Sequence, residues 1–331
     1  MSEGRAQQKD KFRAIIVGAG NIASGFDSPK EKTVLTHAHA YTKNKEVQLI
    51  GFYDIDINKA RRAAKKWNCQ YFSELGEVFE NVEPDIVSVC VDTKNHFQVL
   101  KELVKYKPRL VVCEKPLTEN IQDAEKLLKI YKNNNIPISV NYLRRFDKTV
   151  NNIKREIESG KLGKILCASG IYSKGLLNYG SHLIDICSFL FGDFKKGKVN
   201  YSMADYDEKD RSIAGFLEFK KCKQFNLMIG DSRRYSMFEL DIIFEKGRIK
   251  FFDFGHKISR QTVSDDSRYK GYKSLDKLLI KQTELYNSFP KLVNNAIKFL
   301  KKEEKLLSDL SSAYQTQKIC NYLSNLDKKN V

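Results

Sequence analysis

The chain has 331 residues, of which 41% are hydrophobic and 30% charged, a balance that excludes fibrous, low-complexity and disordered proteins. At roughly 150 residues per domain, this length predicts two globular domains. The net charge is +17, from 58 Lys and Arg against 41 Asp and Glu. Because lysines are scattered along the whole chain and no nucleic-acid reader motif accompanies them, we expect no nucleic-acid partner.

Targeting, membrane and metal signals are absent from the sequence. The apolar runs are far shorter than the roughly 18 residues that a transmembrane helix needs, so we expect no membrane association. The polar stretch Met1–Phe12 lacks the apolar core of a signal peptide, which predicts a frayed tail and a cytoplasmic protein. Seven cysteines occur singly, without a C-x-x-C pair, and predict reduced, packed thiols. We expect no metal, since no cysteine or carboxylate has ligand spacing to His37 or His39.

The first part of the chain alternates short apolar runs with amphipathic charged stretches, which predicts βαβ units and a parallel sheet. The predicted strands are Arg13–Val17, Val47–Tyr53, Asp85–Val91, Leu110–Cys113 and Ile136–Val140. The predicted surface helices, with charges on one face, are Asn58–Trp67, His96–Tyr106 and Asn120–Asn133.

Beyond Leu162 the pattern changes to closely spaced alternating runs, which predict an antiparallel sheet. These runs are Ile165–Tyr172, Lys198–Tyr206, Ala214–Phe219, Phe225–Gly230, Phe238–Phe244 and Arg248–Phe254, with a turn at Lys246-Gly247. From about Lys277 to Leu326 the pattern is helical again. We therefore predict two domains, 11–146 and 147–331, joined at the helical segment Asp147–Ser159, with the last helices able to pack back on the first domain.

A dinucleotide fingerprint follows the first strand. Gly18-Ala19-Gly20-Asn21-Ile22-Ala23 reads G-x-G-x-x-A, whose small residues permit a tight turn and let backbone N–H groups approach a pyrophosphate. Asp54 ends the second strand, where a carboxylate accepts hydrogen bonds from ribose hydroxyls and repels a 2′-phosphate, favouring NAD over NADP. Alternatively, Asp54 caps the following helix, a role that suits Asp56 equally. The long interval from Gly18 to Asp54 predicts an inserted loop within Ser24–Thr36.

Glu114-Lys115-Pro116 stands at the end of a predicted strand, where open α/β sheets place ligand-contacting groups. Together with four further segments, this motif resembles the glucose-fructose oxidoreductase, inositol dehydrogenase and MocA family: Val17–Ala23, Thr36–Tyr41, Asn141–Phe146 and Gly180–Asp185. The resemblance implies an α/β fold with an N-terminal Rossmann domain and a C-terminal α/β domain containing a large, open, mainly antiparallel sheet. An apolar outer face of such a sheet is typically covered by a second subunit, so we expect a homo-oligomer, dimer or tetramer.

The implied activity is NAD-dependent hydride transfer, with NADP the less favoured cofactor. The implied substrate is a secondary alcohol or ketone of a sugar, cyclitol or nucleotide-sugar, in a role such as polysaccharide biosynthesis. Lys115 would contact nicotinamide ribose and substrate, with a cis peptide bond before Pro116, and its ammonium would stabilise a developing alkoxide.

The family's second catalytic segment is D-x-x-x-H, and the corresponding residues here are Asn178 and His182. Four-residue spacing on a helix would put both side chains on one face. His182 is the expected acid/base, whereas the neutral Asn178 cannot stabilise an imidazolium as a carboxylate does. Three consequences stay open: His182 works with a lower pKa, Lys115 carries more of the proton transfer, or the protein only binds.

Further cofactor contacts are implied by position. Glu114, Asn141 and Arg144 follow strands at the predicted cleft, as do Thr93 and His96, for which helix capping by Thr93 or Asn95 is the alternative. Arg144 or Arg145 would pair with a phosphate or carboxylate, or form an interdomain salt bridge.

Two functions of other classes remain beside the dehydrogenase. Asn178 favours a catalytically inactive NAD-binding regulator of the same fold. The other is a glycosidase-like enzyme, in which tightly bound NAD oxidises the sugar transiently and is regenerated in each cycle.

Overall fold

The computed structural model describes residues 11–330, whose contacts divide the chain into two compact units. The first unit comprises the residues up to Glu114, Lys129–Asn141 and Phe289–Leu307. The second comprises Lys115–Leu128, Tyr142–Ser288 and the residues from Ser308 onward. Most of the predicted tail Met1–Phe12 lies outside the described residues. Within residues 11–330, no helix is long and apolar enough to cross a membrane.

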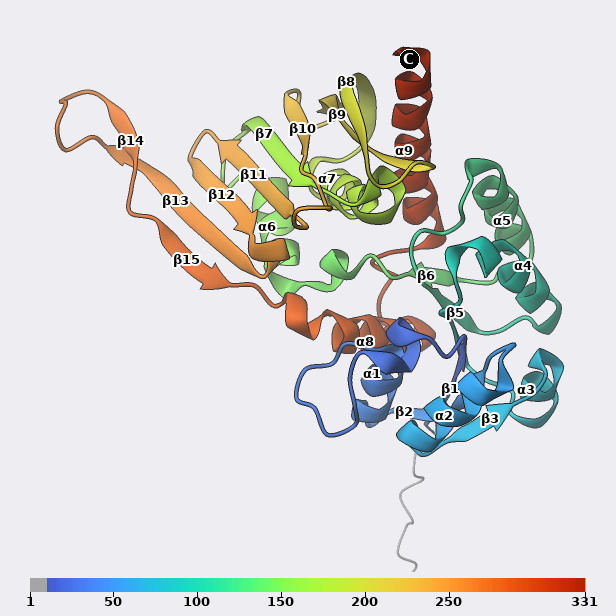
Figure 1. The fold of residues 1–331 in the computed structure, drawn as a ribbon. Helices are drawn as coiled ribbons and strands as arrows, with labels where there is room; N and C mark the ends of the chain where they lie inside the picture. Colours follow the sequence, from blue (N-terminus) through green and yellow to red (C-terminus); the bar gives the residue numbers. More distant parts are fainter. Residues whose placement is uncertain (1–10, 331) are drawn as a thin grey trace, which may run out of the picture. The chain divides into compact units, whose positions relative to one another are not determined.

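The first unit contains a six-stranded parallel sheet with the order β3-β2-β1-β4-β5-β6 (Figure 1). Its strands are β1 Phe12–Val17, β2 Val47–Tyr53, β3 Gln70–Phe72, β4 Ile86–Val89, β5 Leu110–Cys113 and β6 Ile138–Val140. β4 and β5 are buried at every residue, as expected of parallel strands covered on both faces. The strand order reverses between β1 and β4, and open α/β sheets bind ligands at such a reversal.

The helical elements of the N-terminal half confirm most of the predicted positions. They are η1 Asn21–Gly25, α1 His37–Lys43, α2 Ile57–Trp67, α3 Leu75–Asn81, α4 Thr93–Leu103, η2 Val104–Tyr106 and α5 Ile121–Asn133. Residues 26–36 form the predicted inserted loop between η1 and α1. The loop ends at Thr36, whose side chain caps α1 by accepting a hydrogen bond from the His39 N–H.

The second unit contains a nine-stranded sheet with the order β14-β13-β12-β11-β7-β10-β9-β8, β15 pairing with β13. All neighbouring strands are antiparallel except β7 and β10. The strands are β7 Ile165–Tyr172, β8 Phe194–Asp207, β9 Asp210–Phe219, β10 Phe225–Ile229, β11 Phe238–Phe244, β12 Gly247–Phe252, β13 Lys257–Asp265, β14 Lys273–Leu275 and β15 Leu279–Gln282. The predicted α/β fold with a mainly antiparallel second sheet is confirmed.

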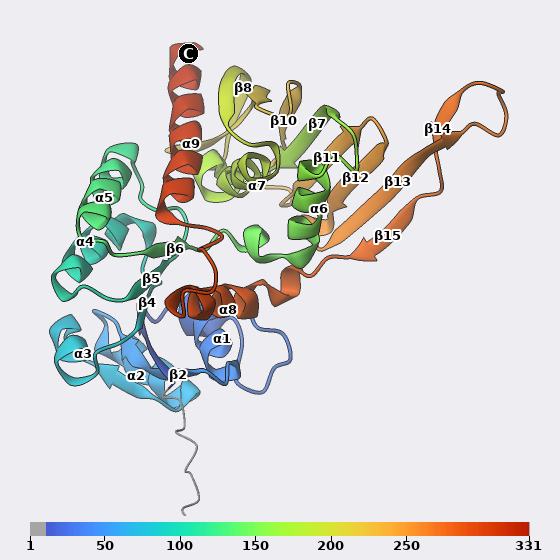
Figure 2. The ribbon, with the colours of Figure 1, turned by 180° about the vertical axis from the view of Figure 1, so that it is seen from behind.

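Most of the remaining helical elements cover one face of this sheet or connect its strands (Figure 2), whereas nearly all of the helix Ser288–Leu300 belongs to the first unit. They are η3 Leu143–Phe146, α6 Lys148–Glu158, η4 Gly175–Gly180, α7 Ser181–Phe191, η5 Asp253–Gly255, η6 Leu285–Asn287, α8 Ser288–Leu300 and α9 Leu310–Asn330. Residues from α6, α7 and α9 join the buried cluster on the sheet. The opposite face exposes Leu166, Phe216 and Ile243, and the prediction that a second subunit covers it stays a prediction.

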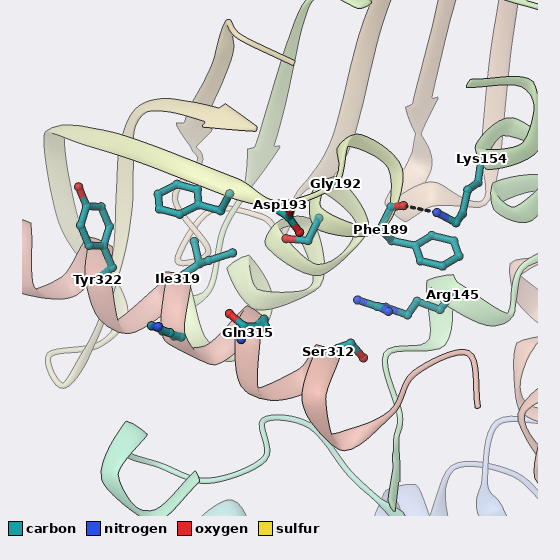
Figure 3. Close-up of a pocket in the computed structure, with 12 residues that line it drawn as sticks. Arg145, Lys154, Phe189, Gly192, Asp193, Ser312, Gln315, Ile319 and Tyr322 are labelled. Atoms are coloured by element: carbon teal, nitrogen blue, oxygen red, sulfur yellow. Dashed lines mark hydrogen bonds between the residues drawn. The ribbon is translucent and has the colours of Figure 1, made fainter. Parts of the chain in front are cut away.

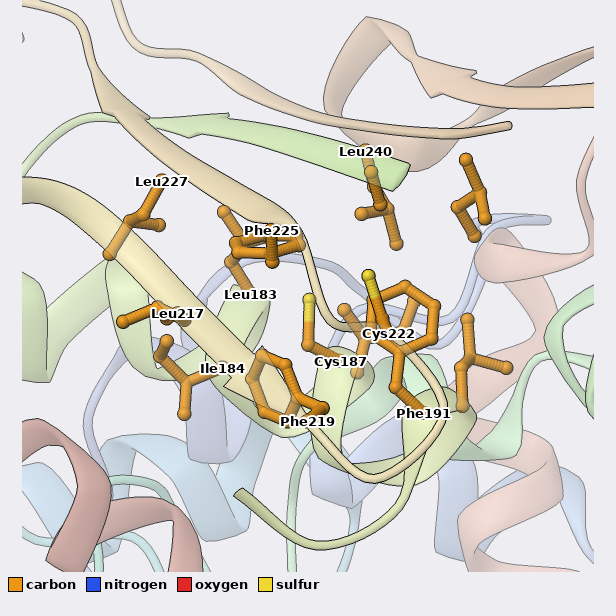
Figure 4. Packing of buried hydrophobic residues seen from close by; sticks show 14 of the residues in the cluster. Leu183, Ile184, Cys187, Phe191, Leu217, Phe219, Cys222, Phe225, Leu227 and Leu240 are labelled. Carbon is orange, nitrogen blue, oxygen red and sulfur yellow. The ribbon is translucent and has the colours of Figure 1, made fainter. Parts of the chain in front are cut away.

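The core of the second unit follows from the period-two alternation of its strands. Along β11 every second residue is buried, and these residues face α7 together with Phe219 and Phe225 (Figure 4). α7 is apolar on several sides because Leu183, Ile184 and Cys187 all pack in this cluster. All seven cysteines are free thiols, five of them buried, which confirms the predicted packed thiols.

Three structural predictions need correction. The helical segment predicted from about Lys277 begins too early, because Leu279–Gln282 forms β15 and α8 begins only at Ser288. β15 is exposed at all four residues, so no burial pattern marks it in the sequence. α4 begins at Thr93, three residues before the predicted start, and Thr93 and Asn95 therefore lie within the helix rather than at its cap.

The burial of Phe225 predicts a large stability loss on truncation. Phe225 is 0% exposed and Phe216, on the neighbouring strand, is 56% exposed. Phe225→Ala should lower the free energy of unfolding by about 3–5 kcal/mol, because it leaves a cavity that the sheet cannot close. The matched Phe216→Ala should change it by about 0.5 kcal/mol or less. Urea denaturation measures both, and equal losses would contradict the assigned core.

Candidate functional site

The glycine loop after β1 is tightly held at one end and open at the other. Gly18 has φ +94°, and a Cβ added there would lie 2.7 Å from the carbonyl carbon of Cys90. Its N–H donates to the Tyr53 carbonyl at 2.7 Å. An added Cβ at Gly20 would meet nothing within 4 Å among the described residues. Asn21 and Ile22 begin η1 directly after this open position. The loop therefore fits a phosphate group approaching its backbone.

Asp54 ties the end of β2 to this loop. Its carboxylate accepts hydrogen bonds from the Ala19 N–H at 2.7 Å and from the Asp56 N–H at 2.9 Å. The capping of α2 belongs to Asp56, whose side chain accepts from the Asn58 N–H, so the capping alternative for Asp54 is wrong. Each Asp54 oxygen keeps a second lone pair for another donor. The ribose-binding role of Asp54 stays a prediction.

Glu114 lies at the carboxyl end of β5 in a buried hydrogen-bond network. His37 Nε2 lies 2.8 Å from Glu114 Oε1, and Asn141 Nδ2 donates to the same oxygen at 2.6 Å. The other ring nitrogen of His37 lies 3.2 Å from Ser88 Oγ. Asn141 Oδ1 is buried and has no partner among the described residues. This unfilled acceptor fits a ligand N–H donor such as the carboxamide of nicotinamide.

The contact of His37 with Glu114 was not predicted from the sequence, where His37 was considered only as a metal ligand. Its spacing to Glu114 is 77 residues, and the parallel sheet brings the two together. His39 is likewise engaged, with Nδ1 2.8 Å from Asp27 Oδ2 in the inserted loop. Among residues 11–330, no three His, Cys, Asp or Glu side chains are placed to hold a metal ion.

His96 and Thr93 lie at the start of α4, after β4. His96 is buried, with Nε2 3.0 Å from the Val91 carbonyl and Nδ1 3.8 Å from Cys113 Sγ. Both ring nitrogens thus have protein partners, which gives His96 a structural role at the strand ends. A contact of Thr93 or His96 with the cofactor stays a prediction.

Lys115 and Asn178, separated by 63 residues, are in direct contact in the second unit. Lys115 Nζ donates to the Asn178 carbonyl oxygen at 2.9 Å and to Asn178 Oδ1 at 3.2 Å. The Lys115–Pro116 peptide bond is cis, as the family resemblance implies. The ring centre of Tyr179 lies 5.9 Å from the same ammonium. The structure therefore joins two of the three predicted catalytic residues.

His182 lies in the first turn of α7, and Asn178 belongs to the π-helical turn η4. η4 continues into α7 without a break in the helical backbone, so the two residues share one helical stretch whose first turn is π-helical rather than α-helical. His182 contacts the rings of Tyr142 and Tyr179, and its Nδ1 is buried without a partner among the described residues. Burial lowers the pKa of His182 well below its ordinary value, and the charges of Lys115 and Arg144 lower it further. The imidazole is neutral at pH 7.

The two arginines after β6 have different environments. Arg145 pairs with the buried Asp185, donating from Nε at 2.8 Å and from Nη2 at 2.8 Å. Both partners lie in the second unit. Arg144 packs on the Phe238 ring at 3.5 Å and donates to the Phe254 carbonyl at 2.8 Å. Burial lowers the pKa of Arg144 to about 10. The predicted contact of Arg144 with the cofactor stays a prediction.

A cavity of about 630 Å³ lies beside α7 and α9 (Figure 3). The cationic side chains of Arg145 and Lys154 line one side of the cavity, and both already have hydrogen-bond partners in the protein. Lys154 donates to the Phe189 carbonyl at 3.0 Å and pairs with Glu158 at 2.7 Å. Lys318, on α9, is a third cation in the lining of the cavity.

Comparisons with known proteins agree with this geometry. Residues 12–142 match a family model described as an oxidoreductase family with an NAD-binding Rossmann fold. The chain is 26% identical over 154 residues to myo-inositol 2-dehydrogenase of Thermotoga maritima, covering 46% of this chain and 42% of that protein. It is 26% identical over 231 residues to glucose-6-phosphate 3-dehydrogenase of Bacillus subtilis, covering 61% and 62%. These alignments span about half the length of the curated relatives.

A solved structure shares the fold over nearly the whole chain. The WlbA dehydrogenase from Bordetella pertussis, solved in complex with NADH and UDP-GlcNAcA, superimposes with a TM-score of 0.77. The match covers 98% of this chain and 97% of that one at 15% sequence identity. Because the sequence identity is low, this likeness establishes the fold of the two units and nothing about their function.

The contrast between the two loop glycines predicts separable effects. Gly20→Ala should leave the unfolding midpoint unchanged but raise the dissociation constant of NADH roughly tenfold or more, because the new methyl group occupies the open approach. Gly18→Ala should instead cost about 1–3 kcal/mol of stability through backbone strain. NADH fluorescence titration and thermal unfolding measure the two effects. Unchanged NADH affinity in Gly20→Ala would rule out this loop as the phosphate site.

The lowered pKa of His182 predicts a pH-dependent stability. An unfolded histidine takes up a proton near pH 6.5, whereas the folded His182 does so only at lower pH, so wild type loses stability as the pH falls below about 6.5. Between pH 7.5 and 5.5, wild type should lose about 1 kcal/mol more than His182→Gln. Urea denaturation at both pH values measures this difference. Equal losses of stability in wild type and in His182→Gln would show that His182 is not kept neutral.

Proposed function

The chain belongs to the glucose-fructose oxidoreductase, inositol dehydrogenase and MocA family of oxidoreductases, and on this premise we propose that it is an NAD-dependent dehydrogenase of a sugar or cyclitol, nucleotide-linked forms included. The reaction interconverts a secondary alcohol and its ketone. The observation that carries the proposal is the contact of Lys115 with Asn178, close to the neutral His182.

The first unit has the features that NAD requires. The open approach to Gly20 suits the pyrophosphate, Asp54 suits the adenosine ribose, and Asn141 Oδ1 is an unfilled acceptor beside Glu114. Asn21 and Ile22 contribute backbone N–H groups next to Gly20. When bound, the nicotinamide cofactor supplies the hydride acceptor or donor.

The residues of the second unit provide the proton chemistry. The Lys115 ammonium hydrogen-bonds the reacting oxygen of the substrate and stabilises the negative charge that develops there. His182, held neutral by burial and by two nearby cations, accepts the hydroxyl proton in the oxidation direction. Asn178 orients Lys115 through its backbone and side-chain oxygens. In the reduction direction the same step runs in reverse, and the imidazolium formed at His182 returns its proton to the oxygen.

A catalytically inactive NAD-binding regulator is the second candidate. The neutral side chain of Asn178 favours it, since this residue contacts Lys115 without contributing a charge. The two candidates differ in one measurable property. Both bind NADH, and only the dehydrogenase reduces NAD when given an alcohol substrate.

The deciding experiment combines cofactor binding with a turnover screen. Titration with NAD, NADH, NADP and NADPH should show preference for the unphosphorylated pair, because Asp54 repels a 2′-phosphate. Absorbance at the NADH band is then followed with cyclitols, sugars, sugar phosphates and nucleotide-sugars. Binding without turnover on any of these would favour the regulator, and no binding of any of the four cofactors would refute both candidates.

Removal of the Lys115 ammonium tests the catalytic assignment. Lys115→Ala should lower kcat/KM on the order of 10²-fold or more, because the charge on the reacting oxygen loses its stabilisation. The affinity for NADH should change only a few-fold, since other residues hold the pyrophosphate and the adenosine ribose. Steady-state kinetics and fluorescence titration measure the two. A variant that turns over at nearly the wild-type rate would remove Lys115 from the mechanism.

A further inference from the structure

Two carboxylates from the sheet hold the turn η4, which carries Asn178. Asp205, on β8, accepts hydrogen bonds from the Lys174 N–H at 2.7 Å and the Gly175 N–H at 3.3 Å. Asp210, the first residue of β9, accepts from the Leu177 N–H at 2.7 Å and the Asn178 N–H at 2.9 Å. The two side chains thus accept from four backbone N–H groups at the start of the turn, and Ser212 Oγ also accepts from the Gly175 N–H at 2.9 Å.

The turn packs directly on the Asp210 carboxylate. Gly175 has φ +80°, and a Cβ added there would lie 2.3 Å from Asp210 Oδ2. This close approach requires glycine at position 175. The position of Asn178 is therefore set by Asp210 and the narrow space above it.

Asn178 links Asp210 to Lys115. Its N–H donates to the Asp210 carboxylate, while its carbonyl and Oδ1 accept from the Lys115 ammonium. Asp205 has no such link, because Lys174 and Gly175, the turn residues that it holds, form no hydrogen bond with Lys115. Asp205 instead accepts from Ser212 Oγ and the Ser232 N–H.

The groups around Asp210 either stabilise or destabilise its charged form, and Lys115 is among those that stabilise it. Burial raises the pKa of Asp210 and Asp207 raises it further, whereas the Leu177 and Asn178 N–H groups and the Lys115 ammonium stabilise its charged form. The Asn178 side chain is neutral, so it offers the ammonium a dipole but no charge. The other titratable groups near this pair among the described residues include Arg144, Tyr172, Lys174, Tyr179, His182, Lys209 and Cys320.

We propose that Asp210 is a positioning residue for Lys115, fixing Asn178 against the ammonium and supplying the negative charge that the amide at position 178 lacks. This inference rests on the proposed function and deepens it. Asp210 touches neither substrate nor cofactor in this role. Its hydrogen bond fixes the position of Asn178, and its negative charge acts on the Lys115 ammonium through space.

Asp210→Asn tests both parts of the proposal. The substitution keeps the size of the side chain but removes its charge, and its NH₂ group cannot accept the second backbone N–H. We expect kcat to fall roughly 10- to 100-fold with KM changed only a few-fold. The pKa that defines the alkaline limb of the pH–rate profile should fall by about one unit. The matched control Asp205→Asn loosens the same turn but should leave the alkaline limb in place.

A second readout is independent of substrate and of turnover. Acetylation of Lys115 by acetic anhydride is followed by mass spectrometry across a pH series, since only the free amine reacts. The pH midpoint of labelling should fall by about one unit in Asp210→Asn and stay within about 0.2 in Asp205→Asn. If wild type shows no turnover on any substrate, the proposed function fails while this labelling still tests the link between Asp210 and Lys115.

Restoring the charge at position 178 completes the test. In the double variant Asn178→Asp with Asp210→Asn, the carboxylate lies where the amide contacts the ammonium, and we expect the labelling midpoint to return toward the wild-type value.

If Asp210→Asn does not fold, Asp210→Glu replaces it. A labelling midpoint within about 0.2 pH units of wild type, together with a lowered kcat, then supports the proposal. The proposal is overturned if Asp210→Asn and Asp205→Asn shift the midpoint equally, if neither shifts it, or if Asp210→Glu shifts it by a full unit.

Discussion

A carboxylate that is taken out of water must replace its lost hydration with hydrogen bonds, and this requirement organises the polar framework of both units. In the first unit, Glu114 is held by His37 and Asn141 at the end of β5. In the second, Asp185 accepts from Arg145 and from the Thr316 hydroxyl. Each partner lies on a different element, so burying the carboxylate also fixes how those elements pack.

The same requirement shapes the catalytic turn. η4 is not a regular α-helix, and its N–H groups point to side chains of the sheet instead of to carbonyls one turn earlier. A π-helical turn leaves such groups free to bond elsewhere, which is frequent at functional sites. The two aspartates at the β8–β9 hairpin satisfy these groups and hold Asn178 in contact with Lys115.

Positive charge dominates the catalytic part of the second unit. Lys115 and Arg144 both lower the pKa of His182, and no carboxylate stands at position 178 to oppose them. This arrangement favours negative charge on a substrate oxygen and disfavours an imidazolium. The departure at Asn178 therefore leaves an imidazolium at His182 without a carboxylate at position 178, while the stabilisation of charge by Lys115 is retained.

Much of the fold was predictable because its strands carry strong hydrophobic patterns. The ends of β2, β5, β7 and β11 coincide with the predicted ones, since each is a largely buried or alternating apolar run. The short β3 and α3, and the strands β13 to β15, were missed. β3 and β15 bury little or nothing, and β13 mixes exposed and buried positions without a strict period.

Local sequence was enough to identify the glycine loop, Asp54 after β2, and Glu114-Lys115-Pro116 after β5, because backbone turns and strand ends depend on neighbouring residues. The partners of those residues depend on how distant parts of the chain come together. His37 reaches Glu114 across 77 residues, and Asp210 reaches Asn178 across 32, through sheet order and hairpin register. Such contacts have no local spacing rule, since a carboxylate needs donors in space and the fold alone determines which donors are close.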